Sequence, residues 1–210
     1  MVKSFRILLS VALLAVLAVG CSHDDNLVTP TADKPAGLPN KDGTETLGPP
    51  SIAIASGSGF AVGGVGMVDA AGGARNISVT VPDGATVVQA ILYWSGGSTT
   101  GGGDDSLVLN GTENVTGALI GGPAFFFAAP INYEFSAYRA EITGLGLVGA
   151  GVSTFSVEGM NFDFTGGEFD ESNGVGVLVI YDDGSDAEIQ LVDGLDLAFF
   201  DFSEPRKSTI

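Results

Sequence analysis

The alternation of apolar and polar residues along the chain predicts a series of short β-strands. Ile77, Val79 and Val81 alternate with polar residues, which gives one apolar face with a period of two. The runs 86–94 and 175–181 are almost entirely apolar, as expected of central strands that are covered on both faces. Shorter patterns of the same kind predict further strands at 107–109, 155–158, 188–191 and 195–202.

Turn residues separate these stretches, and Asn110-Gly111 is the strongest hairpin signal among them. No segment has the period of a long amphipathic helix, because glycines interrupt the one apolar candidate at 145–152. Roughly ten short strands, spaced by about 8–12 residues, are typical of an antiparallel sandwich. The sequence therefore predicts an all-β fold, an antiparallel β-sandwich of the jelly-roll kind.

The N-terminus has the pattern of a secretory signal peptide. Two basic residues precede the apolar run 7–19, which fits the apolar region of a signal and is too short to span a bilayer core. The run ends in small residues before Cys21, which resembles the lipobox of bacterial lipoproteins, although Leu17 stands one place earlier than that pattern prefers. The resemblance implies removal of residues 1–20 and multiple acylation of Cys21, hence firm membrane attachment.

Two other interpretations of this N-terminus stay open, an uncleaved membrane anchor and an ordinary signal peptide cleaved near Ala18 or Gly20. Cys21 is the only cysteine of the chain, so it has no disulfide partner within it. A lone thiol in an exported protein would be reactive and unpaired. Lipidation explains why the single cysteine stands at this position.

The residues after Cys21 are typical of a flexible tether, because prolines lie among polar residues without an apolar period. We therefore predict a signal peptide at 1–20, a lipidated cysteine with its tether at 21–50, and a β-sandwich domain at 51–210. Ser22 follows the cysteine, which in the enterobacterial sorting scheme implies the outer membrane. We expect an exported protein of the cell envelope that faces the periplasm or the surface.

Six segments of the domain carry a second resemblance. They are 90–96, 107–111, 138–143, 155–159, 174–181 and 191–194. In the same order, they resemble an uncharacterised module of large bacterial and archaeal surface proteins. The resemblance implies a β-sandwich in an adhesive or structural setting and brings no catalytic residues. Such modules usually continue with further strands, so a C-terminal truncation of the domain is one expectation.

The negative charge of the chain argues against nucleic acid as a partner. The formal net charge is −17, and Arg139 is the only basic residue between Asn76 and Pro205. Such a surface repels nucleic acid, which is bound through clustered lysines and arginines. A hydrophobic content of 45% argues against disorder as the reason for the acidic composition. We expect Arg139 to pair with a carboxylate inside the sandwich.

The residues needed for most kinds of catalysis are missing from the sequence. His23 is the only histidine and lies in the predicted tether, so neither a Ser-His-Asp triad nor a His/Cys zinc site can be assembled. Carboxylates are plentiful, and one glycine-containing stretch carries Asp163, Glu168, Asp170 and Glu171. An envelope enzyme that acts on polysaccharide through a carboxylate pair is therefore the alternative to a non-enzymatic module.

Calcium is the cofactor that the acidic residues suggest, because hard cations bind six to eight oxygen ligands. A first candidate group follows a predicted strand, and a second lies earlier in the chain. Neither has the spacing of an EF-hand, and hydrated turn-forming acids are the competing interpretation. The two groups are Asp182, Asp183 and Asp186, and Asn161, Asp163, Glu168 and Asp170.

Trp94 and the run Phe125–Phe127 are candidates for a sugar-stacking platform, although core packing is the ordinary role of aromatic residues in strands. Three consecutive strand residues cannot all face one side, so part of the Phe run points away from the core. The sequence thus predicts a lipid-anchored, non-enzymatic module for adhesion or for binding a glycan, matrix or protein ligand. A structural spacer is the third interpretation.

Overall fold

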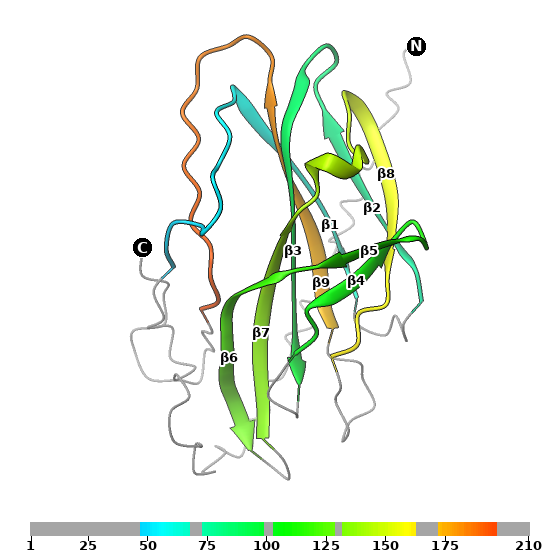
Figure 1. Ribbon diagram of the computed structural model, residues 1–210, viewed down its shortest axis with the longest axis vertical. Coiled ribbons are helices and arrows are strands. Elements are labelled where there is room, and N and C mark those ends of the chain that lie inside the picture. The colour runs from blue at the N-terminus through cyan, green and yellow to red at the C-terminus, as the bar shows by residue number, and fades with distance from the viewer. Residues whose placement is uncertain (1–46, 68–72, 99–102, 129–131, 163–171, 197–210) are drawn as a thin grey trace, which may run out of the picture.

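The computed structural model describes residues 47–67, 73–98, 103–128, 132–162 and 172–196. Within these residues the chain forms nine β-strands and one short 3-10 helix, and the strands make two antiparallel sheets that pack face to face (Figure 1). The predicted all-β sandwich is confirmed. No helix of the described part is long and apolar enough to cross a bilayer.

The larger sheet has five strands with β3 at its centre, in the order β1-β9-β3-β7-β6. Consecutive residues of β3 are buried, so both of its faces are covered, which explains why its sequence is apolar on both. The strands are β1 (Gly59–Gly66), β9 (Ser172–Asp182), β3 (Thr86–Ser98), β7 (Asn132–Glu141) and β6 (Ala118–Ala128).

The smaller sheet has four strands in the order β2-β8-β4-β5. Asn110 and Gly111 join β4 to β5 with φ angles of 49° and 70°, the backbone that the Asn-Gly signal predicts for a hairpin turn. The strands are β2 (Arg75–Val81), β8 (Gly151–Glu158), β4 (Ser106–Leu109) and β5 (Glu113–Thr116), and the 3-10 helix η1 (Thr143–Leu145) follows β7.

The chain winds as a jelly roll. The first strand pairs with the last, β2 with β8, β3 with β7 and β4 with β5. These nested pairs alternate between the two sheets, which is the winding of a jelly roll. The additional strand β6 extends the larger sheet beyond β7.

The core lies between the two sheets and is filled by alternate residues of both. Trp94 of β3 is buried there, stacks on Tyr138 with 5.8 Å between ring centroids, and donates from Nε1 to the carbonyl of Asp104 at 2.9 Å. The interpretation of Trp94 as a core residue is confirmed. Other buried members include Ile77, Val79, Val81, Leu92, Leu107, Leu109, Phe155, Val157, Val175, Val177 and Val179.

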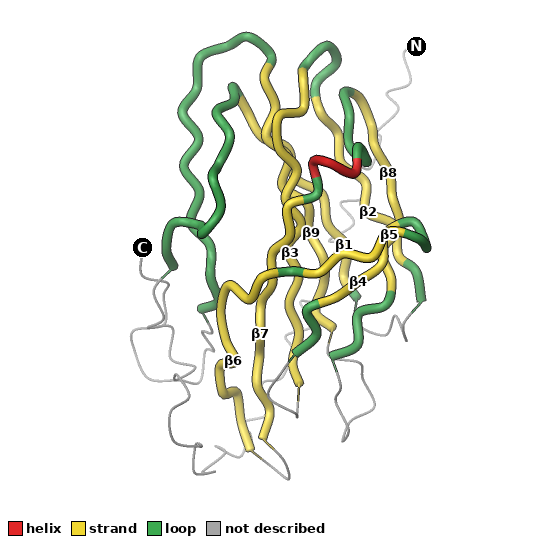
Figure 2. The backbone as a smooth tube through the Cα atoms, viewed as in Figure 1, coloured by secondary structure: helices red, strands yellow, loops and turns green. Residues whose placement is uncertain are grey.

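Two extended segments form a third layer over part of the outer face of the larger sheet, away from the core (Figure 2). We call residues 47–58 the N-terminal strap and residues 183–196 the C-terminal strap. The prediction of strands at 188–191 and at the start of 195–202 is wrong for the described residues, because they join no ladder. The apolar–polar alternation of residues 188–191 arises because Ile189 and Leu191 face the sheet and are half-buried, while Glu188 and Gln190 are exposed. The remainder, 197–202, lies outside the described residues.

Candidate functional site

Arg139 is buried on the outer face of the larger sheet. Its neighbours in β7, Tyr138 and Ala140, belong to the core, so strand alternation directs Arg139 to the opposite face. The side chain is almost fully buried, since Arg139 is only 2% exposed. A charged guanidinium without water is costly unless it is paired and hydrogen-bonded.

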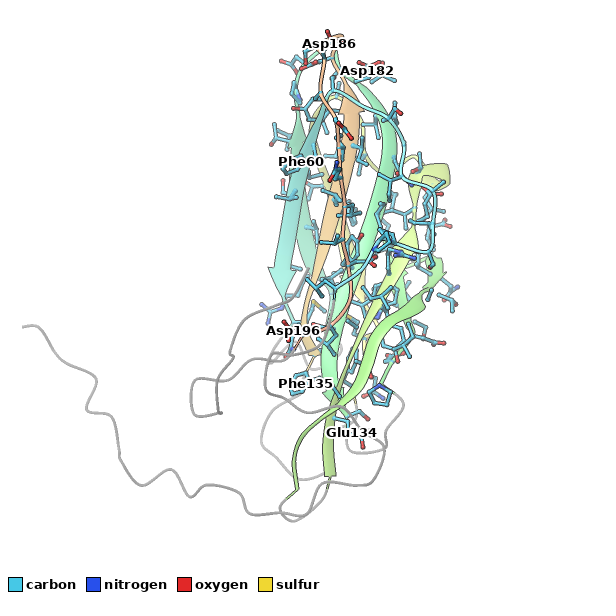
Figure 3. All side chains as sticks on the ribbon, turned by 90° about the vertical axis from the view of Figure 1, so that its left-hand side faces the viewer. Phe60, Glu134, Phe135, Asp182, Asp186 and Asp196 are labelled. Carbon is cyan, nitrogen blue, oxygen red and sulfur yellow. The ribbon has the colours of Figure 1, made fainter. Side chains whose placement is uncertain are left out.

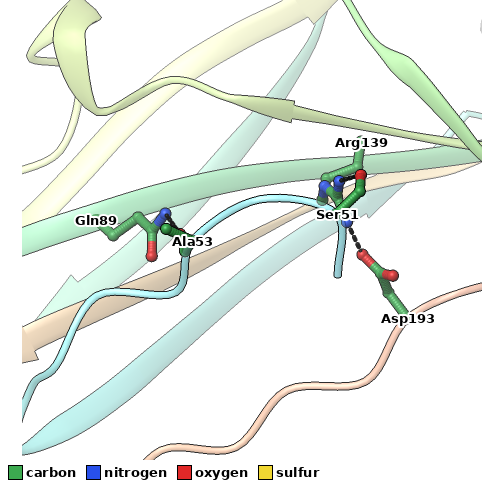
Figure 4. Close-up of polar contacts among 5 residues, drawn as sticks. All are labelled: Ser51, Ala53, Gln89, Arg139 and Asp193. Atoms are coloured by element: carbon green, nitrogen blue, oxygen red, sulfur yellow. Dashed lines mark hydrogen bonds and ion pairs between the residues drawn. The ribbon is translucent and has the colours of Figure 1, made fainter. Parts of the chain in front are cut away.

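Both straps supply the partners of Arg139. Its Nη1 forms an ion pair with Asp193 of the C-terminal strap, and its Nη2 donates to Ser51 Oγ of the N-terminal strap at 2.8 Å (Figure 4). Gly48 and Asp193 then exchange backbone hydrogen bonds of 3.0 and 2.8 Å. We call Arg139, Asp193 and Ser51 the Arg139 latch. The expected carboxylate partner is confirmed, but the pair lies beneath the straps and not between the sheets.

Gln89 holds the N-terminal strap further along. Its Oε1 accepts from the amide of Ala55 at 2.8 Å, and its Nε2 donates to the carbonyl of Ala53 at 3.0 Å (Figure 4). The ladder between β3 and β9 shifts register beside Gln89. The primary amide uses one N–H donor and its carbonyl acceptor here, and thus makes the two hydrogen bonds that a neighbouring strand would offer the strap.

Tyr93 of β3 lies opposite Arg139 in the ladder with β7. Burial raises the pKa of Tyr93 to about 12, the negative charge of Asp193 adds to the rise, and Arg139 opposes it. The phenol is therefore neutral at physiological pH. Because the folded-state pKa is the higher one, the contribution of this group to stability is lost as the pH rises from about 10 to about 12. Its buried hydroxyl has no hydrogen-bond partner among the described residues.

A shallow groove of about 200 Å³ runs between the C-terminal strap and the outer face of β1 and β9. Phe60, which Figure 3 labels on β1, forms part of its wall. Most of the lining is apolar, with two polar side chains from the strap, Glu188 and Gln190. The lining residues are Phe60, Leu178, Glu188, Ile189, Gln190 and Leu191.

The first predicted calcium group lies at the turn that begins the C-terminal strap (Figure 3). Asp183 Oδ1 accepts from Ser185 Oγ at 2.6 Å and from Ser58 Oγ at 2.8 Å. These hydrogen bonds lower the pKa of Asp183 to about 2, with Ser185 contributing most. Asp182 Oδ1 accepts from the amide of Gly184 at 2.9 Å. The two carboxylates therefore stabilise the turn, and Asp186 is exposed nearby.

The other predicted site residues are only partly described. The amide of Asn161 donates to Asp104 Oδ2 at 2.6 Å, whereas Asp163, Glu168 and Asp170 lie outside the described residues, as does Cys21. In the described ranges, no group of three or more His, Cys, Asp or Glu side chains could hold a metal ion. Calcium binding stays a prediction.

Phe125–Phe127 lies in β6, but the structure describes only its backbone. The ladder with β7 shifts register between Phe125 and Phe127. The directions of the three rings lie outside the described part of the structure, so the expectation that they do not share one face stays a prediction.

Sequence reasoning missed Asp193, Ser51 and Gln89 as structural residues. Asp193 stands before a glycine and therefore suggested only a turn. Gln89 carried a usable signal, because a polar residue within an apolar strand needs a buried partner. Comparison with known proteins finds no matching family model, no similar curated protein and no similar solved structure.

Replacing Asp193 should destabilise the fold strongly. Asp193→Asn leaves Arg139 buried without a counter-charge, which we expect to lower the free energy of unfolding by about 3–5 kcal/mol. Asp186→Asn is the matched control, because it removes an exposed acid from the same strap and should change stability by less than about 0.5 kcal/mol. Urea denaturation followed by Trp94 fluorescence measures both. Equal effects would contradict the latch.

Calcium should stabilise the folded protein if it binds among Asp182, Asp183 and Asp186. At one hundred times the dissociation constant, linkage gives about 2.7 kcal/mol, a rise in Tm of roughly 5–10 °C. Magnesium should do less, because it requires tighter octahedral geometry. Thermal melts with chelator, calcium or magnesium at fixed ionic strength test this. No shift, or equal shifts with both ions, would contradict calcium binding, and a shift that survives Asp183→Asn would place the ion elsewhere.

Proposed function

We propose that the chain is a lipid-anchored, non-enzymatic module of the cell envelope or surface that binds a glycan, matrix or protein ligand. The observation that carries the proposal is Cys21, the single cysteine, placed directly after an apolar run of signal-peptide length. Acyl chains on that cysteine would attach the protein to a membrane, and the sandwich would stand outside the cytoplasm.

The position of the straps supports a module held away from the membrane. The first described contacts of the chain are those of residues 47 and 48 with Gly194 and Asp193 of the C-terminal strap. About 25 residues therefore separate Cys21 from the N-terminal strap, a length that reaches roughly 85 Å when fully extended. Such a tether would let the domain bind ligands that lie well beyond the lipid headgroups of the membrane.

The groove beside the C-terminal strap is the candidate ligand surface. Its apolar walls, with Glu188 and Gln190 at the margin, suit a ligand that combines an apolar face with hydrogen-bonding groups. A sugar ring and an apolar peptide side chain both have this character. The strong negative charge of the chain argues against nucleic acid as the ligand.

Anchoring is tested by Cys21→Ser. The variant should lose metabolic labelling with a fatty acid and leave the membrane fraction, because the acylated thiol is gone. Ser22→Ala, one residue further on, is the control and should keep both properties. A Cys21→Ser protein that stays as firmly bound as wild type would show that the apolar run is an uncleaved anchor.

Ligand binding is tested by screening the protein against glycans and envelope polysaccharides for binding and turnover. Leu191→Ala should weaken binding at least about tenfold, because it removes a wall of the groove, whereas exposed Val192→Ala should not. Turnover abolished by Asp163→Asn or Glu168→Gln would instead establish the carboxylate enzyme. If the screen detects no binding and no turnover, the result would favour a structural spacer.

A further inference from the structure

Among the described residues the sandwich has four edge strands, β1 and β6 in the larger sheet and β2 and β5 in the smaller one. An edge strand presents unpaired N–H and C=O groups to any other extended chain. Natural proteins therefore protect edges with charges, prolines, irregular register or short length. The four edges of this protein differ sharply in that respect.

Three of the edges carry such protection. Pro123 and several register shifts interrupt β6. The strand β5 has only four residues and begins with the charged Glu113. The strand β2 begins with exposed Arg75, and its other outward side chains are polar. Each of these edges carries a charge, a proline or an irregular register that disfavours pairing with a further strand.

The fourth edge, β1, has no such protection. Its eight residues include neither a charge nor a proline, and Phe60 and Val62 are 61% and 66% exposed. Met67 donates to Asn173 of β9, so alternation along the ladder turns the N–H and C=O groups of the even-numbered residues 60–66 away from β9. Figure 3 shows β1 at the margin of the larger sheet.

We propose that β1 is a dimerisation edge, which pairs antiparallel with β1 of a second copy about a two-fold axis at Gly63. The larger sheets of the two copies then form one continuous sheet. In this register the outward backbone groups of each β1 hydrogen-bond to those of the other.

The sequence of β1 is complementary to itself in this register. Phe60 faces Gly66 of the second copy, and Val62 faces Gly64 of the second copy, so that each large side chain on the outer face lies opposite a glycine. On the inner face, Ala61 lies opposite Val65 in the same way. The pairing therefore buries apolar surface without a steric clash between large side chains.

Charge also favours a second copy in the antiparallel orientation. Ser58, just before β1, hydrogen-bonds to Asp182 and Asp183, so acids gather at that end. Arg75 lies at the other end, because Gly63 packs on Ser78 of β2, and β2 begins on the side of the molecule where β1 ends (Figure 1).

Antiparallel pairing brings the acids of one copy to the end that carries Arg75 in the other. Parallel pairing would place the two acidic ends side by side. In the antiparallel pair, the two acidic ends are separated by the length of the strand, about 27 Å for eight residues. This distance is well beyond a Debye length of about 8 Å, so salt largely screens their repulsion. The chain has a net charge of −17, and β1 itself adds no charge to a contact between two copies.

A single strand pair is a small interface, so we expect a weak dimer. It should form at protein concentrations in about the micromolar range. The experiment is light scattering after size exclusion of the full chain in a nonionic detergent, over a range of concentrations. Val62→Lys places a charge on the edge and should raise the dimer dissociation constant at least about tenfold.

Val152→Lys is the matched control. Val152 is 71% exposed on β8, which is not an edge, so this variant has the same charge change at a similar exposure. Both variants lower the overall repulsion between copies, so the loss of the dimer only in Val62→Lys identifies β1. Trp94 fluorescence checks that both variants are folded.

Hydrogen exchange supplies the second readout. The amides of Phe60, Val62 and Gly64 should gain protection as the wild-type concentration rises and should stay unprotected in Val62→Lys. A wild-type protein that remains monomeric, a dimer that persists in Val62→Lys, or a dimer lost equally in both variants would overturn the proposal. Co-purification of a different chain on β1 would also overturn it.

Discussion

The buried charge of Arg139 is the constraint on which the third layer of this structure depends. A guanidinium on the outer face of a sheet would ordinarily be hydrated, and covering it is unfavourable unless a carboxylate and further acceptors replace the water. Asp193 and Ser51 provide those partners from opposite ends of the described chain. The straps can therefore lie over the sheet only together, because each supplies part of what Arg139 needs.

The jelly-roll winding explains why the two straps meet. The first and last strands, β1 and β9, are neighbours, so the segments before β1 and after β9 leave the sheet at the same end. Both then turn back over the outer face, where Gly48 and Asp193 bond directly. The chain that would lead to a membrane anchor thus joins the domain through Ser51 and Gln89 before it enters the sandwich. The same winding leaves β1 at the open margin.

The sequence predicted the elements whose signals are local. The alternation at Ile77, Val79 and Val81, the Asn110-Gly111 turn and the apolar central strand all depend on neighbouring residues, and the structure confirms them. The extended straps could not be distinguished from strands, because Ile189 and Leu191 face a sheet in either case. The partner of Arg139 lies 54 residues away, and no local period encodes such a contact.

Hydrogen exchange at Gly48 and Asp193 tests the central claim most directly. The amide of each residue donates to the carbonyl oxygen of the other across the two straps. In the wild type both amides should therefore be protected and should open together. In Arg139→Gln both should lose protection, while Leu92, which is buried on the central strand β3 between β7 and β9, keeps its own. Full exchange of Gly48 and Asp193 in the wild type, or protection that survives Arg139→Gln, would contradict the account.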